Sequence, residues 1–342
     1  RNKIMLKCII WDLDNTIWDG TLLENSNVVL KENSVRILEA AHDRGIIQTI
    51  CSKNDFENAS EKLELLGIHK FFVYPQINMC RKSDNIKSFL NDMHFRAEDV
   101  LFVDDMEFEL EEVRFSIPGI DTINISDYRT LEKKIYAEEV KNAEQVERRT
   151  YLYKMEETRL YERSKYHDIS AFLMQSSFKV HIDPAKESEL PRIEELLERT
   201  HQLNTTGIAY SREEIRDMLG KENWLVLIGS VSDKYGDYGK SALLIAKKNS
   251  NEYVVKVMII SCRLMGKGIT DYLLFYLYRL AFRRGIKKLI VEYRKNKYNR
   301  SMQVLLQMND FIRNEISPDF YQFYIDVKDS ERIKSPEWIC EV

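Results

Sequence analysis

Short apolar runs alternate with amphipathic stretches through residues 1–127. The apolar runs predict strands, and the stretches with apolar residues three and four positions apart predict helices. The predicted strands are residues 8–13, 46–51, 71–74, 100–103 and 122–125. The predicted helices are residues 33–44, 55–66, 84–93 and 107–115. Repeated strand–helix units of this kind predict a parallel α/β sheet covered on both faces, with ligands bound beyond the carboxyl ends of the strands.

The pattern changes again after this first domain. Residues 128–174 are rich in Glu, Lys, Arg and Tyr and contain neither Pro nor Gly, which predicts a long charged helical connector. Strand and helix patterns then return, with a long amphipathic helix at residues 268–284 among strands that are mostly antiparallel. We therefore expect a domain at 1–127, a connector at 128–176 and an α+β domain at 177–342.

Composition limits the class of protein. Hydrophobic residues make up 44% and charged residues 31% of the 342, as in a globular protein with real cores, and 12 Gly and 6 Pro exclude a collagen-like chain. No apolar run approaches the ~18 residues of a membrane span. The chain opens without methionine or the apolar segment of a signal peptide, so we expect a mature fragment or a piece of a longer protein.

Cysteines and charges narrow the picture further. The 5 cysteines are scattered and never spaced C-x-x-C, which argues against a disulfide framework or a structural zinc and for a reducing cytoplasm. A formal net charge of -4 does not indicate a nucleic-acid binder. Residues 263–300, however, hold 11 Lys and Arg against 2 Asp and Glu. A concentrated basic face on an acidic chain favours a local acidic partner.

Acidic side chains follow the first predicted strand. Asp12 and Asp14 lie one residue apart at the end of an apolar run, where two carboxylates are costly unless a cation or a reaction requires them. Ser52 comes directly after the second strand, Lys82 precedes a helix, and Asp104 follows another strand. Because the carboxyl ends of parallel strands meet at one edge of a sheet, we expect these side chains to form one site.

This arrangement resembles the haloacid dehalogenase (HAD) superfamily of aspartate-nucleophile phosphatases. The resemblance implies that Asp12 attacks phosphorus, while Asp14 first protonates the leaving oxygen and then activates water. Ser52 and Lys82 would bind and neutralise the phosphoryl oxygens. Further substrate and phosphate contacts would come from Thr16, Lys53, Asn54 and Asn78. A Mg²⁺ ion would be held by Asp12, the Asp14 carbonyl, Asp104 and Asp105.

A closer match lies in residues 7–18, 51–55 and 77–78, which resemble the FkbH-like family. Members of that family take the glyceryl unit of 1,3-bisphosphoglycerate, remove its phosphate, and load it as a thioester on an acyl carrier protein in polyketide-type biosynthesis. Only 35 residues separate Thr16 from Ser52 and 29 separate Ser52 from Lys82, which leaves no room for a cap domain. We therefore expect a capless HAD-like domain, open to a bulky substrate.

Glyceryl transfer requires a nucleophile that can carry an acyl group, and Cys51 beside Ser52 is the candidate thiol. Strand alternation offers another interpretation, in which Cys51 is a buried hydrophobic residue that points away from Ser52. Both alternatives remain open from the sequence.

In the second domain, Arg263, Gly266, Lys267 and Gly268 follow an apolar strand and open the long helix. The R-x-x-G-x-G spacing is similar to the phosphate loop of GNAT acyltransferases, whose backbone N–H groups would receive a phosphopantetheine arm. With the basic cluster nearby, this resemblance implies an acidic, phosphopantetheinylated acyl carrier protein as partner. An alternative is a HAD phosphatase fused to an N-acyltransferase in sugar or polysaccharide modification.

Overall fold

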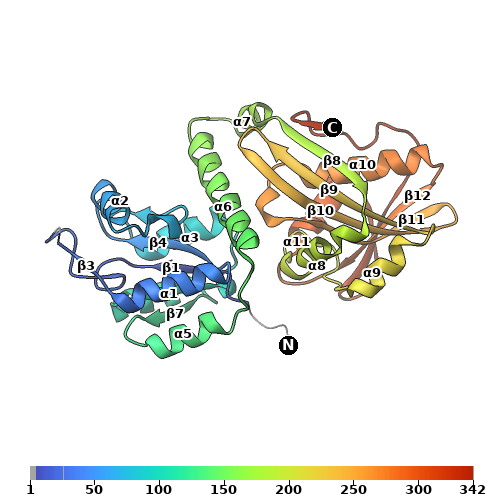
Figure 1. The fold of residues 1–342 in the computed structure, drawn as a ribbon. Helices are drawn as coiled ribbons and strands as arrows, with labels where there is room; N and C mark the ends of the chain where they lie inside the picture. Colours follow the sequence, from blue (N-terminus) through green and yellow to red (C-terminus); the bar gives the residue numbers. More distant parts are fainter. Residues whose placement is uncertain (1–4, 26, 342) are drawn as a thin grey trace. The chain divides into compact units, whose positions relative to one another are not determined.

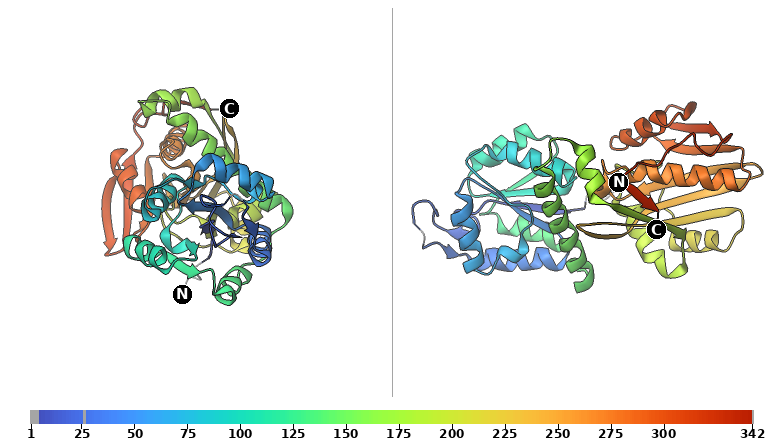
Figure 2. Two further views of the ribbon diagram at one scale, coloured as in Figure 1. Left: turned by 90° about the vertical axis from the view of Figure 1, so that its left-hand side faces the viewer. Right: turned by 90° about the horizontal axis from the view of Figure 1, so that it is seen from above.

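The computed structural model describes residues 5–25 and 27–341. It divides into two compact units, Arg1–Glu162 and Arg163–Val342, which we call the N-terminal and C-terminal units. Each has its own sheet, which can be followed in Figures 1 and 2. Most of the stretch predicted as a connector, including the helix Tyr128–Tyr136, belongs to the N-terminal unit. Among the described residues, no helix is long and apolar enough to cross a membrane.

The N-terminal unit contains the predicted parallel sheet, and its strand order is β5-β4-β1-β6-β7. The strands are β1 (Cys8–Trp11), β4 (Ile47–Ser52), β5 (Gln76–Ile77), β6 (Val100–Asp104) and β7 (Asp121–Asn124). In the centre, Trp11 of β1 lies in register with Ile50 of β4 on one side and Val103 of β6 on the other. These three strands therefore end at the same edge, and the residues that follow them come together there.

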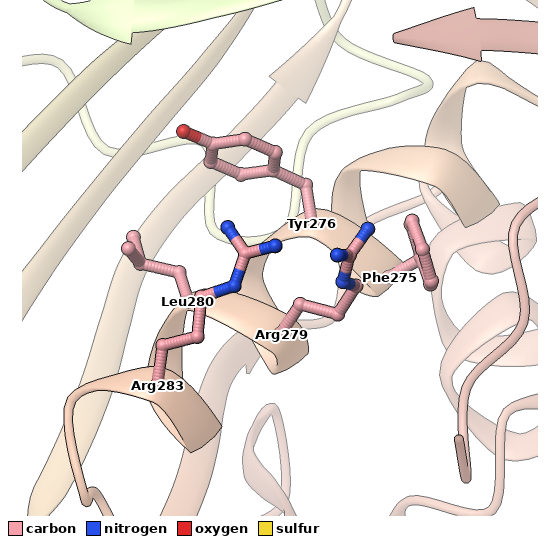
Figure 3. Close-up of a pocket in the computed structure, with 5 residues that line it drawn as sticks. All are labelled: Phe275, Tyr276, Arg279, Leu280 and Arg283. Carbon is pink, nitrogen blue, oxygen red and sulfur yellow. The ribbon is translucent and has the colours of Figure 1, made fainter. Parts of the chain in front are cut away.

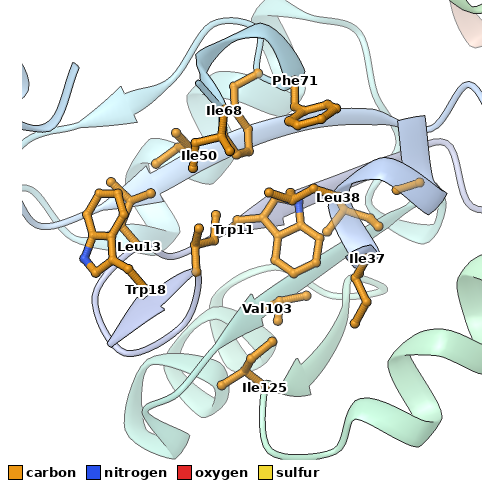
Figure 4. Close-up of a cluster of buried hydrophobic side chains, with 14 of the residues drawn as sticks. Trp11, Leu13, Trp18, Ile37, Leu38, Ile50, Ile68, Phe71, Val103 and Ile125 are labelled. Atoms are coloured by element: carbon orange, nitrogen blue, oxygen red, sulfur yellow. The ribbon is translucent and has the colours of Figure 1, made fainter. Parts of the chain in front are cut away.

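Helices cover both faces of this sheet. One face packs against α1 (Glu32–Asp43), α2 (Phe56–Leu65) and α5 (Tyr128–Tyr136), and the other packs against α3 (Lys82–Asp92), α4 (Glu107–Ser116) and α6 (Ala143–Arg163). Figure 4 shows the first of these cores, with Trp11 beside Leu38 of α1. The indole of Trp11 donates to Gln48 Oε1 at 3.1 Å, and Gln48 Nε2 donates to Leu38 O at 2.9 Å. The buried polar groups that fix β1 against α1 are thus satisfied.

Two local features differ from the prediction. Residues 71–74 are not a strand: His69–Phe71 form a 3₁₀ helix, and the third strand is the short β5 further on. Phe71, Phe72 and Val73 are buried in the core, and they reach the sheet only through an isolated bridge between Phe72 and Gln48 and the hydrogen bond from Val73 N to Gln48 O at 3.0 Å among the described contacts. The segment after Thr16 holds a small two-stranded sheet of β2 (Trp18–Asp19) and β3 (Val29–Leu30) before α1 begins. The described residues of the two segments between Thr16 and Lys82 form β2, β3, α1, β4, α2, the 3₁₀ helix and β5, so among them no cap domain is present, as predicted.

The C-terminal unit is built on a mixed sheet in the order β13-β14-β12-β11-β10-β9-β8-β15, which confirms the predicted α+β class. The strands are β8 (Phe178–Pro184), β9 (Trp224–Asp233), β10 (Gly236–Asn249), β11 (Glu252–Ile260), β12 (Lys288–Arg294), β13 (Ile312–Ser317), β14 (Phe320–Asp326) and β15 (Ile339–Glu341). The last three were not predicted. The helices are α7 (Ile169–Ser176), α8 (Leu190–Arg199), α9 (Arg212–Leu219), α10 (Ile269–Arg283) and α11 (Arg300–Met308). Helices α8 and α9 share a core with β9, β10 and β11, while α10 packs against β11 and β12.

Candidate active site

Side chains from distant parts of the N-terminal unit meet at the carboxyl edge of its sheet. Asp12 follows β1. Its backbone N–H donates to Val103 O at 2.9 Å, so Asp12 stays paired with β6 near the end of that strand. Ser52 and Asp104 are the last residues of β4 and β6, and Lys82 is the first residue of α3. All four are buried. The structure therefore brings together the residues that the topology was expected to collect.

Lys82 joins the two central carboxylates. Its Nζ lies 2.8 Å from Asp12 Oδ1 and 2.6 Å from Asp104 Oδ2. Burial raises the pKa of Asp12 to about 6, although Lys82 opposes that shift. Burial also works against the charge on Lys82, but Asp12 and Asp104 outweigh it and raise the pKa of the ammonium group. Such a buried ion pair is tolerated only where its geometry compensates for lost hydration, and it indicates a functional site.

A third carboxylate completes an acidic cluster. Asp12, Asp104 and Asp105 can each offer one carboxylate oxygen, and these oxygens lie within 4.8 Å of one another. Burial raises the pKa of Asp105, and the charge of Asp12 adds to the effect. Hard oxygen donors in this number suit Mg²⁺, which keeps several waters and uses few carboxylates. The donor set therefore fits the expected metal.

The carboxylate of Asp14 is turned away from this cluster. Its Oδ1 accepts hydrogen bonds from Trp18 Nε1 at 2.8 Å and from Leu22 N at 3.0 Å, while its Oδ2 accepts from Asn54 Nδ2 at 2.9 Å. The side chain thus stands beside the acidic cluster rather than within it. Only the backbone carbonyl of Asp14 is left as the ligand that the family resemblance implies. The indole of Trp18, four residues further on, was not singled out from the sequence.

Of the remaining predicted phosphate contacts, two are near the centre and two are engaged elsewhere. Thr16 Oγ1 makes a long contact of 3.5 Å to Asp12 Oδ2, and Asn54 contacts Ser52 as well as Asp14. Lys53 Nζ instead pairs with Glu109 of α4 at 2.6 Å. Asn78 exchanges side-chain hydrogen bonds with Asn85 of α3. Lys53 and Asn78 are thus held by neighbours outside the acidic cluster.

The thiol of Cys51 lies in the hydrophobic core. Cys51 is 1% exposed, and it packs with α3 residues such as Ile86 and Phe89. Its Sγ is 3.6 Å from Lys82 O, and burial raises the pKa of the thiol. A nucleophilic cysteine needs access and a stabilised thiolate, and this environment supplies neither. The geometry therefore favours, of the two alternatives, the one in which Cys51 is a core residue.

The predicted phosphate loop of the C-terminal unit is a tight turn. Gly266 and Gly268 have φ of +70° and +77°, which only glycine adopts without strain, and Gly268 caps α10. Lys267 is buried, and its Nζ donates to Arg263 O. The Trp338 indole donates to Lys267 O at 2.9 Å. A Cβ placed on Gly268 would lie only 3.0 Å from this indole, so the C-terminal segment rests directly against the loop.

Part of the predicted basic cluster lines a pocket on α10. Arg279 and Arg283 stand one turn apart, and Figure 3 shows both guanidinium groups on the same side of the helix near Tyr276. The Arg279 guanidinium also lies 5.2 Å from the centre of the Phe275 ring. Both arginines and their aromatic neighbours come from a single helix, unlike the charged residues of the N-terminal unit.

No protein-family model and no curated protein matches this chain. Among solved structures, it is similar to the N-terminal part of a Bacteroides fragilis protein containing a phosphatase domain complexed with Mg (27% identity, TM-score 0.34), with 40% of this chain and 42% of that chain covered. It is similar to an Escherichia coli ribosomal-protein-S18-alanine N-acetyltransferase (16%, TM-score 0.36, covering 44% and 95%). It is also similar to a Thermoplasma acidophilum N-acetyltransferase in complex with coenzyme A (12%, TM-score 0.36, covering 43% and 98%). The chain thus spans less than half of the Bacteroides fragilis chain that it matches.

Proposed function

We propose that the N-terminal unit is a Mg²⁺-dependent phosphoryl-transfer enzyme with Asp12 as its nucleophile. The observation that carries this proposal is the buried ammonium of Lys82 between Asp12 and Asp104. An oxygen nucleophile, a fixed cation and further acidic ligands at one strand edge are the parts that phosphoryl transfer needs, since it depends on positioning and charge neutralisation. A phosphatase domain crystallised with Mg among the similar structures agrees with the same chemistry.

The reaction would proceed in two steps on this chain's own residues. A carboxylate oxygen of Asp12 forms a bond to phosphorus while the bond to the leaving oxygen breaks, and Asp14 protonates that oxygen. Water then attacks the aspartyl-phosphate as Asp14 takes its proton, and inorganic phosphate leaves with Asp12 restored. Ser52 and Lys82 bind the phosphoryl oxygens throughout. Mg²⁺, held by Asp12, Asp104 and Asp105, would neutralise charge on these oxygens.

The aspartyl-phosphate provides the direct test. Rapid acid quenching after mixing the protein with Mg²⁺ and p-nitrophenyl phosphate should trap one phosphoryl group, which peptide mass spectrometry should locate on Asp12. Hydroxylamine should remove the group, because an acyl phosphate reacts with it and a phosphoserine does not. Phosphate release without any trapped aspartyl-phosphate, or a phosphoryl group on another residue, would refute this mechanism.

We further propose that the substrate is 1,3-bisphosphoglycerate and that the product is a glyceryl thioester on an acyl carrier protein. The carrier's thiol would attack the C1 carbonyl and displace the acyl phosphate, and the aspartate chemistry would hydrolyse the phosphate ester at C3. The family-like segments around Asp12 and Ser52 support this reading, as does a strand edge with no cap domain. The arginines of α10 suit an acidic carrier.

The substrate proposal has its own experiment. The protein is incubated with 1,3-bisphosphoglycerate, Mg²⁺ and a phosphopantetheinylated carrier protein, and the intact carrier is weighed. A glyceryl mass on the carrier is expected. If an aspartyl-phosphate forms but several carriers stay unmodified, the transferase assignment fails while the phosphoryl chemistry stands. Consumption of acetyl-CoA with an amino-sugar acceptor would instead favour a phosphatase fused to an N-acyltransferase.

A further inference from the structure

Asn54 links the two halves of the phosphoryl-transfer machinery. It lies two residues beyond the end of β4 and is 1% exposed. Its amide nitrogen contacts Asp14 and Ser52, which stand beside the acidic cluster. The distance from Asn54 Nδ2 is 2.9 Å to Asp14 Oδ2 and 3.1 Å to Ser52 Oγ. One amide group therefore holds the proposed acid and base together with the hydroxyl that is to bind phosphate.

The hydrogen bond to Ser52 also determines where the serine proton points. Since Ser52 Oγ accepts from Asn54, the single proton of the hydroxyl is available to an acceptor other than Asn54, such as a phosphoryl oxygen. Asn54 thus connects Asp14 and Ser52 through one amide nitrogen.

The other end of the amide has no such partner. Asn54 Oδ1 is buried and has no hydrogen-bond partner among the described residues. Exchanging the two amide atoms would not help, because it would set an oxygen against the carboxylate of Asp14. A buried acceptor without a donor is costly, and such groups are concentrated where a ligand or a reacting molecule supplies the missing partner.

We propose that Asn54 is a positioning residue for the hydrolytic step, an inference that rests on the proposed function. Its Nδ2 holds Asp14 in place as the base that takes one proton of the attacking water. Its free Oδ1 accepts the other proton of that water, so that the water lone pair faces phosphorus. Asn54 thereby acts through Asp14 and the water, without a bond to the substrate.

Separate measurement of the two chemical steps tests this role. We would use p-nitrophenyl phosphate, whose leaving group departs without protonation, so that formation of the aspartyl-phosphate depends little on Asp14. Rapid-quench kinetics of Asn54→Ala and Asn54→Asp should show hydrolysis of the aspartyl-phosphate slowed by about tenfold or more, with formation changed far less. The phosphorylated form should then accumulate in both variants.

The two variants remove different parts of the amide. Asn54→Asp keeps the shape and an acceptor oxygen but removes the donor to Asp14 and Ser52, whereas Asn54→Ala removes both functions. Asn58→Ala, an exposed asparagine in α2, is the matched control and should behave as the unaltered protein. Asn58→Ala should keep the melting temperature and Mg²⁺ affinity of the unaltered protein. Both Asn54 variants should melt at a lower temperature, because one loses a buried side chain and the other sets an oxygen against Asp14, so all rates are compared at a temperature at which every variant is folded. If Asn54→Ala does not fold, the isosteric Asn54→Asp carries the test.

Two results would overturn the inference. Both steps could slow equally with p-nitrophenyl phosphate, which would indicate a general structural role, or both variants could hydrolyse the aspartyl-phosphate within twofold of the unaltered rate. Either result leaves the proposed function intact. If the unaltered protein forms no aspartyl-phosphate at all, the proposed function fails and this inference fails with it.

Discussion

The carboxyl edge of the N-terminal sheet and the glycine-rich turn before α10 both came from short sequence motifs, but they are built in different ways. At the sheet edge, Asp12, Lys82 and Asp104 come from three distant segments and face one another while buried. At the turn, Lys267 folds back onto its own loop and the indole of Trp338 covers the neighbouring backbone. The first region concentrates charge that only a reaction or a ligand explains, whereas in the second the described contacts of Lys267 and Trp338 are made within the same unit.

This contrast shows what a motif alone leaves open. A glycine pair at the start of a helix is required by the backbone turn itself, whether or not a phosphate binds. Buried acids at the end of a strand have no comparable structural reason, because burial without a purpose would destabilise the protein. Convergence of charge from separate strands is therefore the stronger indication of chemistry.

The largest expected effect is the loss of phosphate release when the nucleophile at the carboxyl edge of the N-terminal sheet is replaced. Asp12→Asn should lower phosphate release by about a thousandfold or more, because the amide cannot act as the nucleophile. The substitution should also abolish the trapped aspartyl-phosphate. Steady-state assays and quenched-flow mass spectrometry measure both quantities. Asp43→Asn, an exposed acid at the end of α1, serves as control and should retain the full rate. More than a tenth of the original rate in Asp12→Asn would exclude Asp12 as the nucleophile.

The next effect concerns stability. Lys82→Met leaves Asp12 and Asp104 buried without their shared cation, which should lower the free energy of unfolding by about 3–5 kcal/mol. Urea unfolding measures the loss, and Lys87→Met on the exposed side of α3 is the matched control. Added Mg²⁺ should restore part of the stability in Lys82→Met, because a divalent ion can replace the missing positive charge among the carboxylates. Equal unfolding midpoints for the two variants would contradict this account of the cluster.

The parallel sheet and its helices could be predicted because buried strands are continuous apolar runs and their helices repeat every three to four residues. The third strand was misplaced because Phe71, Phe72 and Val73 are as apolar as a strand, but Phe71 ends a 3₁₀ helix and Phe72 forms only an isolated bridge to Gln48. The strand β13 was missed because all of its side chains are exposed, which leaves no alternation to detect.

The same limit applies to the candidate site. The strand-end positions of Asp12, Ser52 and Asp104 follow from topology, so their convergence could be predicted. The direction in which Asp14 turns could not, because its partners Trp18 and Leu22 are fixed by the small sheet that follows Thr16. Likewise, nothing local in the sequence places Trp338 against Gly268, since the contact joins segments far apart in the chain.

The turn before α10 can be tested through its two glycines. Both have positive φ, but only Gly268 has a neighbour in the way of a side chain, since nothing lies within 4 Å of a Cβ placed on Gly266. Gly266→Ala should therefore cost about 1–2 kcal/mol from backbone strain, and Gly268→Ala about 2–4 kcal/mol from strain plus the clash with Trp338. Denaturant unfolding gives both values. Adding Trp338→Ala should relieve part of the cost at Gly268 and none at Gly266. Equal costs at the two glycines would mean that the indole does not confine this loop.

The smallest expected effect comes from replacing Cys51, which lies next to Ser52 at the carboxyl edge of the N-terminal sheet. Cys51→Ser should leave formation and hydrolysis of the aspartyl-phosphate within twofold, because the thiol lies in the core and its raised pKa, caused by burial, disfavours the thiolate. Stability should fall by about 1 kcal/mol, since a hydroxyl is placed among apolar neighbours. Cys80→Ser, an exposed cysteine, is the control and should change neither quantity. Loss of glyceryl transfer in Cys51→Ser with phosphoryl chemistry intact would instead show that Cys51 carries the acyl group, and the reactive region would then reach one residue deeper into β4.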